Sequence, residues 1–174
     1  MPASQTQPET VVGAIPLRRQ RSLGRQDSFV GVVTSQRLII AQMTNEMMKE
    51  AAQQARELAK AAGKGFLGQW SDQLKATFGY TRRYLTMEPS AVLSETPGNF
   101  GIGNGAIGEI KVELKRISTQ DQNRREFEIK IESSSGEFDF RMDEDDDYAN
   151  LLKQVYGERV KMPFGYSFHP VKIG

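Results

Sequence analysis

The chain has no cysteine, and its 174 residues include a single histidine and a single tryptophan. The absence of cysteine excludes a disulfide scaffold, thiol catalysis and cysteine-ligated zinc, and it fits a reducing compartment. With one histidine, His169, a Ser-His-Asp relay or a histidine metal site would depend on one residue near the C-terminus. We therefore expect no enzyme activity, no cofactor and no metal.

Excess charge and long apolar runs are also missing. The formal net charge is +1, so bulk charge does not favour a nucleic-acid-binding protein. No stretch approaches the roughly 20 apolar residues of a membrane span, and the N-terminus lacks the pattern of a signal peptide. We expect a cytoplasmic protein, with peripheral attachment to a membrane as the alternative.

The composition is that of one folded domain, with 38% hydrophobic and 26% charged residues. Residues 1–9 are polar, contain proline, and are expected to form a disordered tail. The domain is expected over 10–157, followed by a C-terminal tail over 158–174.

Strand patterns occur in two blocks, separated by a helical block. Apolar or alternating runs bounded by turn residues predict seven strands, and the hairpin turn at 34–36 predicts that its two neighbours pair antiparallel. The expected strands are 11–17, 28–33, 37–42, 99–102, 106–117, 125–133 and 136–142.

Three segments are predicted to be helical, and the class is therefore α+β. One helix starts at a Thr44 or Asn45 cap, and a second covers 66–84. A closing helix lies within 143–160, with carboxylates in its first turn and Gly157 as its C-terminal cap. The segment 87–100 contains two prolines and is expected to be a connection.

This order of elements resembles the bacterial and prokaryotic pleckstrin-homology-like (PH-like) domains. The resemblance covers 10–157 and rests on a V-T-x-x-R-L-I-type turn and a later isoleucine pattern, carried by Val33, Thr34, Arg37, Leu38, Ile39, Ile102, Ile107 and Ile110. It implies an antiparallel, partly open β-barrel with a C-terminal helix. The departure is a two-helix insertion over 44–96 after the third strand, which looks like that of an uncharacterised subgroup.

Two motifs with a possible chemical role are better explained by architecture. The G-x-G-x-x-G spacing of GNGAIG, 103–108, is followed by a strand pattern rather than a helix, which disfavours a dinucleotide site and favours a turn. The acidic run 143–147 lacks the glycine and glutamate that a calcium loop needs at its sixth and twelfth positions. We expect it to cap a helix instead.

An arginine-rich segment between the first two strands is the first candidate site. Guanidinium groups bind phosphate, and the resemblance implies an anionic lipid headgroup as ligand, although a solvated loop is the simpler alternative. Nucleic acid is not expected, because 18–27 has no aromatic residue for base stacking. The candidate residues are Arg18, Arg19, Arg21, Arg25 and Arg37.

An apolar stripe on the helical insertion is the second candidate site. Its residues either pack within the protein or meet a partner or a second copy of the chain. The candidate contact residues are Met47, Phe66, Trp70, Leu74 and Phe78. The expected function is a non-enzymatic binding or scaffolding domain that contacts protein and self-associates, and the alternative is a peripheral membrane module.

Overall fold

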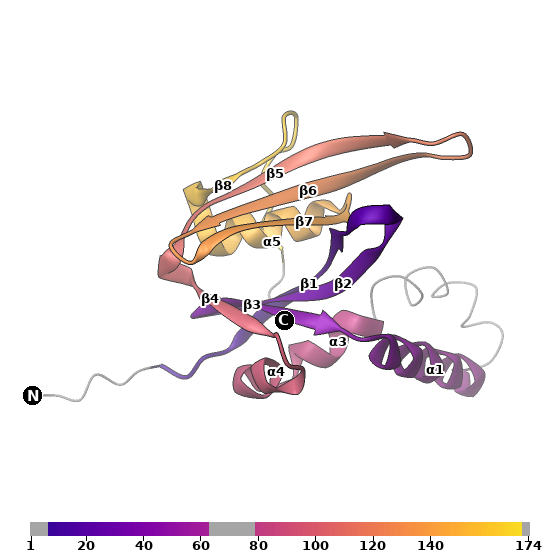
Figure 1. Cartoon of the computed structure of the whole chain (residues 1–174). Helices are drawn as coiled ribbons and strands as arrows, with labels where there is room; N and C mark the ends of the chain where they lie inside the picture. The colour runs from indigo at the N-terminus through magenta and orange to yellow at the C-terminus, as the bar shows by residue number, and fades with distance from the viewer. Residues whose placement is uncertain (1–6, 63–78, 172–174) are drawn as a thin grey trace, which may run out of the picture.

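The computed structural model describes residues 7–62 and 79–171. These form an α+β fold in which one eight-stranded sheet has the order β4-β3-β2-β1-β7-β6-β5-β8 (Figure 1). Every neighbouring pair is antiparallel except β5 and β8. The strands are β1 (Val11–Gln20), β2 (Gln26–Thr34), β3 (Arg37–Met43), β4 (Phe100–Gly103), β5 (Ile107–Ser118), β6 (Asn123–Ser133), β7 (Gly136–Asp143) and β8 (Val160–Lys161).

Within the described residues, four longer helices and three short 3-10 turns join these strands. The first three helices lie between β3 and β4, where the sequence predicts an insertion of only two, and the fourth follows β7. They are α1 (Asn45–Ala62), α3 (Gly79–Leu85), α4 (Pro89–Glu95) and α5 (Asp146–Tyr156), and the turns are η1 (Ser22–Gly24), η3 (Asn104–Ala106) and η4 (Gly157–Arg159).

The sheet folds over on itself at the junction of β1 and β7. These strands share one register pair, Arg18 with Arg141, whereas β1 and β2 pair from Val11 to Gln20. The halves β1–β4 and β5–β7 therefore diverge and enclose the main core, to which both halves, β8 and α5 contribute buried side chains. β4 and β8 are the end strands, so strand pairing does not close the sheet.

A second core covers the outer face of β1–β3. Val30, Val32 and Ile39 point away from the main core and pack with Tyr84 of α3 and Val92 of α4. Both faces of β2 are therefore buried from Phe29 onward, which explains why 29–33 is continuously apolar instead of alternating. In β5 the expected alternation holds, because its outer face meets solvent.

The closing helix α5 is capped as the sequence predicts. The Asp145 carboxylate accepts a hydrogen bond from the backbone N–H of Asp147 at 2.9 Å, and Gly157 ends the helix with a positive φ of 62°. Gly13 of β1 faces α5, and a Cβ on it would lie 2.5 Å from a methyl group of Leu151. Glycine therefore lets α5 approach the sheet closely.

Three boundaries differ from the sequence-based expectation. β1 continues to Gln20 because its antiparallel pairing with β2 extends to the pair Gln20 and Gln26. Part of the segment expected as a connection forms α4, which starts at Pro89, where the missing N–H of proline costs nothing. Within 158–174, β8 pairs with β5, so the domain extends beyond residue 157.

Candidate functional site: the arginine-rich end of the sheet

The predicted arginines lie at one end of the β1–β2 hairpin, with one exception. Arg18 and Arg19 are on β1 itself and not in the connecting loop as the sequence suggested. Arg21 and Arg25 flank the turn η1, and the Arg21 N–H donates to the Arg25 carbonyl at 2.8 Å, which closes the loop. We call residues 21–25 the arginine loop.

Leu23 forms the tip of the arginine loop. Its side chain is 93% exposed, and its φ of 65° makes it the one described residue other than glycine with a positive φ. A leucine in this left-handed conformation is unfavourable, and exposure of its side chain gives no compensating burial. The loop therefore holds an apolar side chain out in solvent between two arginines.

Asp27 is the acidic partner of the arginine loop. Its carboxylate accepts a hydrogen bond from Arg21 and lies 3.8 Å from the Arg19 guanidinium, which also lies over the Phe29 ring at 5.0 Å. The Arg25 side chain makes no ion pair with any residue of the described chain. On the arginine loop itself, Arg21 and Arg25 against this one aspartate leave an excess of one positive charge, which favours anions.

Behind the arginine loop, three more guanidiniums surround one buried carboxylate. Glu126 of β6 is 1% exposed and accepts hydrogen bonds from Arg141 at 2.9 Å, and from Arg18 and Arg124 at 3.2 Å each. Arg18 also donates to Asp143 at 2.8 Å. This cluster joins β1, β6 and β7 where β1 and β7 meet, so Arg18 serves the architecture as well as the local charge.

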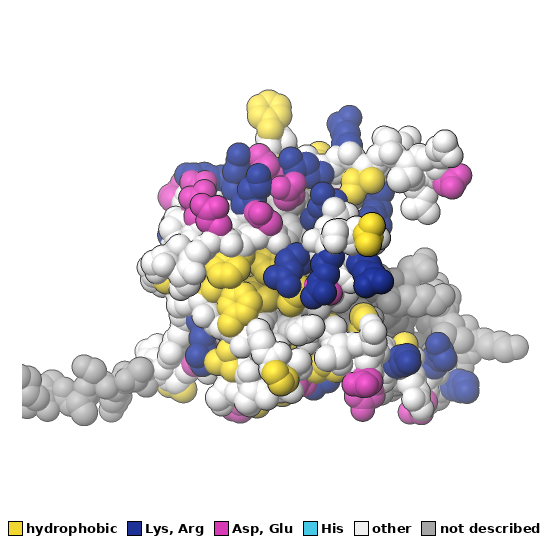
Figure 2. Space-filling model, viewed as in Figure 1, with side chains coloured by type: hydrophobic (Ala, Val, Ile, Leu, Met, Phe, Trp, Pro, Cys, Tyr) yellow, Lys and Arg dark blue, Asp and Glu magenta, His cyan; other side chains and the backbone are white. Residues whose placement is uncertain are grey.

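A pocket of about 410 Å³ lies where β1 and β7 part. Phe138 and Phe140 form its apolar wall, and Figure 2 shows hydrophobic side chains gathered beside Lys and Arg side chains on this face. Its charged residues balance, with three arginines and three carboxylates. The lining residues are Arg18, Arg19, Gln20, Glu128, Glu137, Phe138, Asp139, Phe140 and Arg141. The positive excess is therefore on the arginine loop and not in the pocket.

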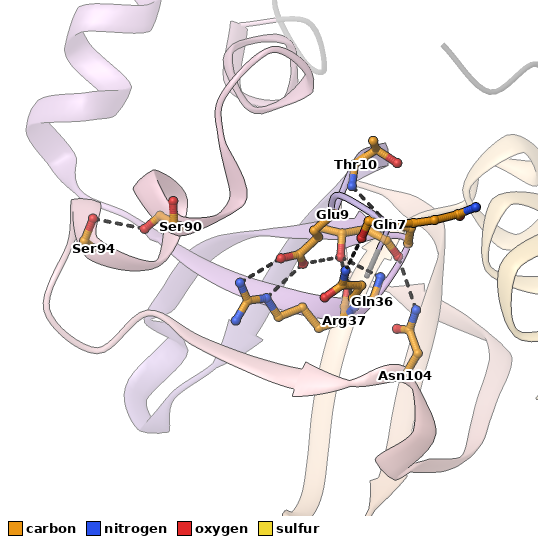
Figure 3. Close-up of polar contacts among 10 residues, drawn as sticks. Gln7, Glu9, Thr10, Gln36, Arg37, Ser90, Ser94 and Asn104 are labelled. Atoms are coloured by element: carbon orange, nitrogen blue, oxygen red, sulfur yellow. Dashed lines mark hydrogen bonds and ion pairs between the residues drawn. The ribbon is translucent and has the colours of Figure 1, made fainter. Parts of the chain in front are cut away.

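Arg37 is the exception, because it lies at the opposite end of β2. It starts β3, and its guanidinium donates to both carboxylate oxygens of Glu9, at 2.9 and 2.8 Å (Figure 3). Burial of Glu9 opposes its ionisation, but the hydrogen bonds from Arg37 and Thr34 and the charge of Arg37 outweigh it and lower the pKa of Glu9. Arg37 therefore binds an anion from its own chain and does not join the arginine loop.

The second candidate site is described only in part. Met47 on α1 packs against the second core, and the Thr44 hydroxyl accepts a hydrogen bond from its N–H at 3.2 Å, as expected of a cap. Phe66, Trp70, Leu74 and Phe78 lie outside the described residues. Within the described chain, Met47 is therefore a packing residue.

The glycine motif 103–108 forms a turn between two strands, as expected. Asn104 in η3 accepts a hydrogen bond from the Tyr156 hydroxyl at 3.0 Å and donates to the Thr34 carbonyl at 3.2 Å. Arg159 donates to the carbonyls of Asn104 and Ile107 at 2.6 and 2.9 Å. Burial raises the pKa of Tyr156, so its hydroxyl stays protonated as a donor. The motif fastens β4 and β5 to α5 and the residues that follow it.

Sequence reasoning missed two features of this end of the molecule. Arg124 and Arg141 join the cluster around Glu126 only through the register of β6 with β7, which no local pattern reveals. The isolated apolar residue in RRQRSLGR, Leu23, was visible in the sequence as the one aliphatic side chain among polar neighbours.

Comparison of the chain with protein-family models, with curated proteins and with solved structures gives no match. Among the described helices, none is both long and apolar enough to cross a membrane.

Proposed function

We propose that this chain is a non-enzymatic binding domain of the PH-like type, and that its arginine loop contacts the surface of a membrane containing anionic lipid. The strand order supports the PH-like part of the proposal. Strands β4-β3-β2-β1 are followed across the sheet by β7-β6-β5, and a helix after β7 packs between the two halves. The resemblance implies a partly open barrel with a C-terminal helix, so an unclosed antiparallel sheet with a helix after β7 supports this part of the proposal.

The exposed Leu23 between Arg21 and Arg25 is the observation that carries the membrane assignment. An apolar side chain inserts into the boundary between headgroups and acyl chains, while arginines beside it bind phosphate or carboxylate groups of anionic headgroups. Each basic residue near an anionic surface contributes about 1 kcal/mol. Because the excess on the loop is only one charge, binding through this loop is weak and sensitive to salt.

Flotation of the full chain with vesicles tests this proposal. We expect the protein to float with phosphatidylcholine vesicles that contain phosphatidylserine, and not with phosphatidylcholine alone. Reversal of both loop charges, Arg21→Glu with Arg25→Glu, should lower the partition coefficient by more than about 100-fold, because four units of charge change at the surface. Added salt should weaken binding by the wild type.

A matched variant separates the loop from the net charge. Arg56→Glu with Arg82→Glu changes the same four units of charge at exposed residues on α1 and α3. We expect this variant to float like the wild type. Equal loss of binding in both variants, or a wild type that ignores anionic vesicles at low salt, would refute the loop as the binding site.

Self-association through the insertion is the second candidate function. The four-residue spacing of Phe66, Trp70, Leu74 and Phe78 supports it, because this spacing places apolar side chains on one side of a helix. The variant Trp70→Ala with Phe78→Ala should lower the mass measured by light scattering while the circular dichroism spectrum stays unchanged. An assembly that keeps its mass in this variant would exclude the stripe as the contact.

A further inference from the structure

A second apolar side chain projects from the molecule in the segment after β8. Pro163–Tyr166 forms a β-turn, with the Tyr166 N–H donating to the Pro163 carbonyl at 3.1 Å and Gly165 at a φ of 84°. Phe164 occupies the tip of this turn and is fully exposed, with a relative accessibility of 104%. Figure 1 shows the segment after β8 rising from the top of the molecule, and Figure 2 shows a hydrophobic side chain standing clear of the surface there.

The turn is held firmly at its base. Pro163 is buried, and the Tyr166 ring packs edge-on against the buried Phe127 with ring centres 5.3 Å apart. The Tyr166 hydroxyl donates to Glu144, which also accepts a hydrogen bond from Arg125 at 2.6 Å. The exposure of Phe164 is therefore imposed by its anchored neighbours, and little conformational entropy is lost when the ring binds a partner.

After the turn, the chain returns to α5 along two side-chain contacts. The backbone N–H of His169 donates to the side-chain oxygen of the buried Asn150 at 2.9 Å, and that of Val171 donates to Gln154 at 2.9 Å. Both ends of the segment are thus fixed to the domain. Phe164 lies between these fixed points, where no described side chain covers it.

Consecutive residues at the junction between β7 and α5 contact the base of the turn and the strand before the arginine loop. Glu144 binds Tyr166 at the base of the turn, and the preceding residue, Asp143, binds Arg18 on the strand that leads into the loop. Leu23 and Phe164 are therefore two exposed apolar tips whose supporting segments both contact the end of β7.

The charge at this end is small, so attachment through the arginine loop alone is weak. Asp145, Asp146 and Asp147 begin α5 close to the junction and oppose an anionic surface. A single weak membrane-binding element gives marginal and reversible attachment, and stable attachment needs two such elements. A second apolar contact is therefore what this surface requires.

We propose that Phe164 is a second membrane anchor, which inserts its ring into the interface of the same anionic bilayer that the arginine loop contacts. The proposal rests on the membrane function argued above, and it adds a contact in a segment that the sequence assigns to a tail. Phe164→Ala should lower the partition coefficient on vesicles containing phosphatidylserine by about tenfold, which is the low end for burial of a phenylalanine ring. Leu85→Ala is the matched control, because Leu85 is 47% exposed but lies on α3, against the outer face of β1–β3.

Single-tryptophan reporters distinguish this proposal from the function on which it rests. Trp70→Phe removes the one native tryptophan, and Phe164→Trp or Leu23→Trp then places a reporter at either tip. With phosphatidylserine-containing vesicles we expect both reporters to shift to shorter emission wavelength and to be quenched by lipids brominated on the acyl chain.

Two other outcomes would refute one or both proposals. If the Leu23→Trp reporter inserts while the Phe164→Trp reporter keeps its emission in water, the second anchor is refuted and the membrane function stands. If neither reporter responds and the chain does not float with the vesicles, the membrane function fails, and the second anchor fails with it.

Discussion

Arginine occurs at the turns at both ends of β2, but the arginines at the two turns differ in their acidic partners. At the β2–β3 turn, the guanidinium of Arg37 is held by both carboxylate oxygens of Glu9. At the β1–β2 turn, Arg25 has no acidic partner in the described chain, and Arg21 shares Asp27 with Arg19. The first arginine fastens the N-terminal segment to the sheet, whereas the second group remains available to a ligand.

The comparison shows that the local partner, and not the residue type, separates a structural arginine from a binding one. A bidentate pair that is shielded from solvent gives strength and direction, because both components are held by the fold. An exposed cation close to a shared carboxylate contributes little to stability, so it remains available to a ligand.

The largest effect on stability is expected at Glu126. Its carboxylate binds the arginines behind the loop and so gives them a structural role. Glu126→Gln removes the charge that Arg18, Arg124 and Arg141 share in a site that is 1% exposed. We expect the free energy of unfolding to fall by about 3 kcal/mol, because three partly exposed guanidiniums lose the buried carboxylate that they share. Urea unfolding followed by circular dichroism measures this change.

Glu128→Gln is the matched control for that experiment. Glu128 lies on the same strand and face but pairs with Lys115 and Lys130 at the surface, each at 3.5 Å. The expected change is below about 0.5 kcal/mol. Similar losses of unfolding free energy in both variants would show that the cluster around Glu126 stabilises the fold no more than a surface ion pair does.

An intermediate effect on stability is expected at the β2–β3 turn, where Glu9 binds Arg37. Glu9→Gln should reduce the free energy of unfolding by about 1 to 2 kcal/mol at neutral pH, because charge-assisted hydrogen bonds to Arg37 are lost. The fold lowers the pKa of Glu9 below 4.5, so its stabilisation is complete above that pH and is lost as pH falls through the folded value. The unfolding curves of variant and wild type should therefore converge in acid.

The same variant has to leave membrane binding unchanged, because Glu9 and Arg37 are at the far end of β2 from the arginine loop. Flotation with phosphatidylserine-containing vesicles checks this expectation. A change in partition coefficient would mean that the β2–β3 turn affects the arginine loop. The two turns could then not be assigned separate structural and binding roles.

The sequence predicted elements better than it predicted contacts. The alternation of Ile110 and Val112 with charged residues, and the two-residue turn after Thr34, are local signals, and the structure confirms both. Five arginines were grouped because four are close in sequence, yet β2 separates Arg37 from the others by its full length. Grouping by sequence distance fails whenever a strand lies between two residues.

Features set by pairing between distant strands had no local signal. Glu126 reads as one of several charged residues on an amphipathic strand, and only the meeting of β1 with β7 buries it among arginines. Similarly, Phe164 lies in a segment with no periodicity, and its exposure follows from the contacts of Tyr166 with Phe127 and Glu144. Such roles depend on tertiary structure.

The smallest effect on stability is expected at Leu23, where stability and vesicle binding should change in opposite directions. Leu23→Gly relieves the left-handed backbone, which costs a leucine about 1 to 2 kcal/mol, but it adds freedom to the unfolded chain, so we expect a net gain of about 0.5 kcal/mol. Vesicle binding should fall about tenfold, because the apolar tip is removed. Urea unfolding and flotation on the same sample measure both effects.

Gly24→Ala provides the opposite combination in the next residue. Gly24 has a φ of 71°, and no atom lies within 4 Å of the position that a Cβ would take, so alanine meets no clash but adopts an unfavourable backbone conformation. We expect a loss of about 1 kcal/mol in stability with vesicle binding retained. If Leu23→Gly destabilises the protein and binds vesicles normally, the leucine is structural. Stabilisation with weaker binding would instead show that the exposed leucine is kept for a ligand at a cost in stability, as expected of a functional site.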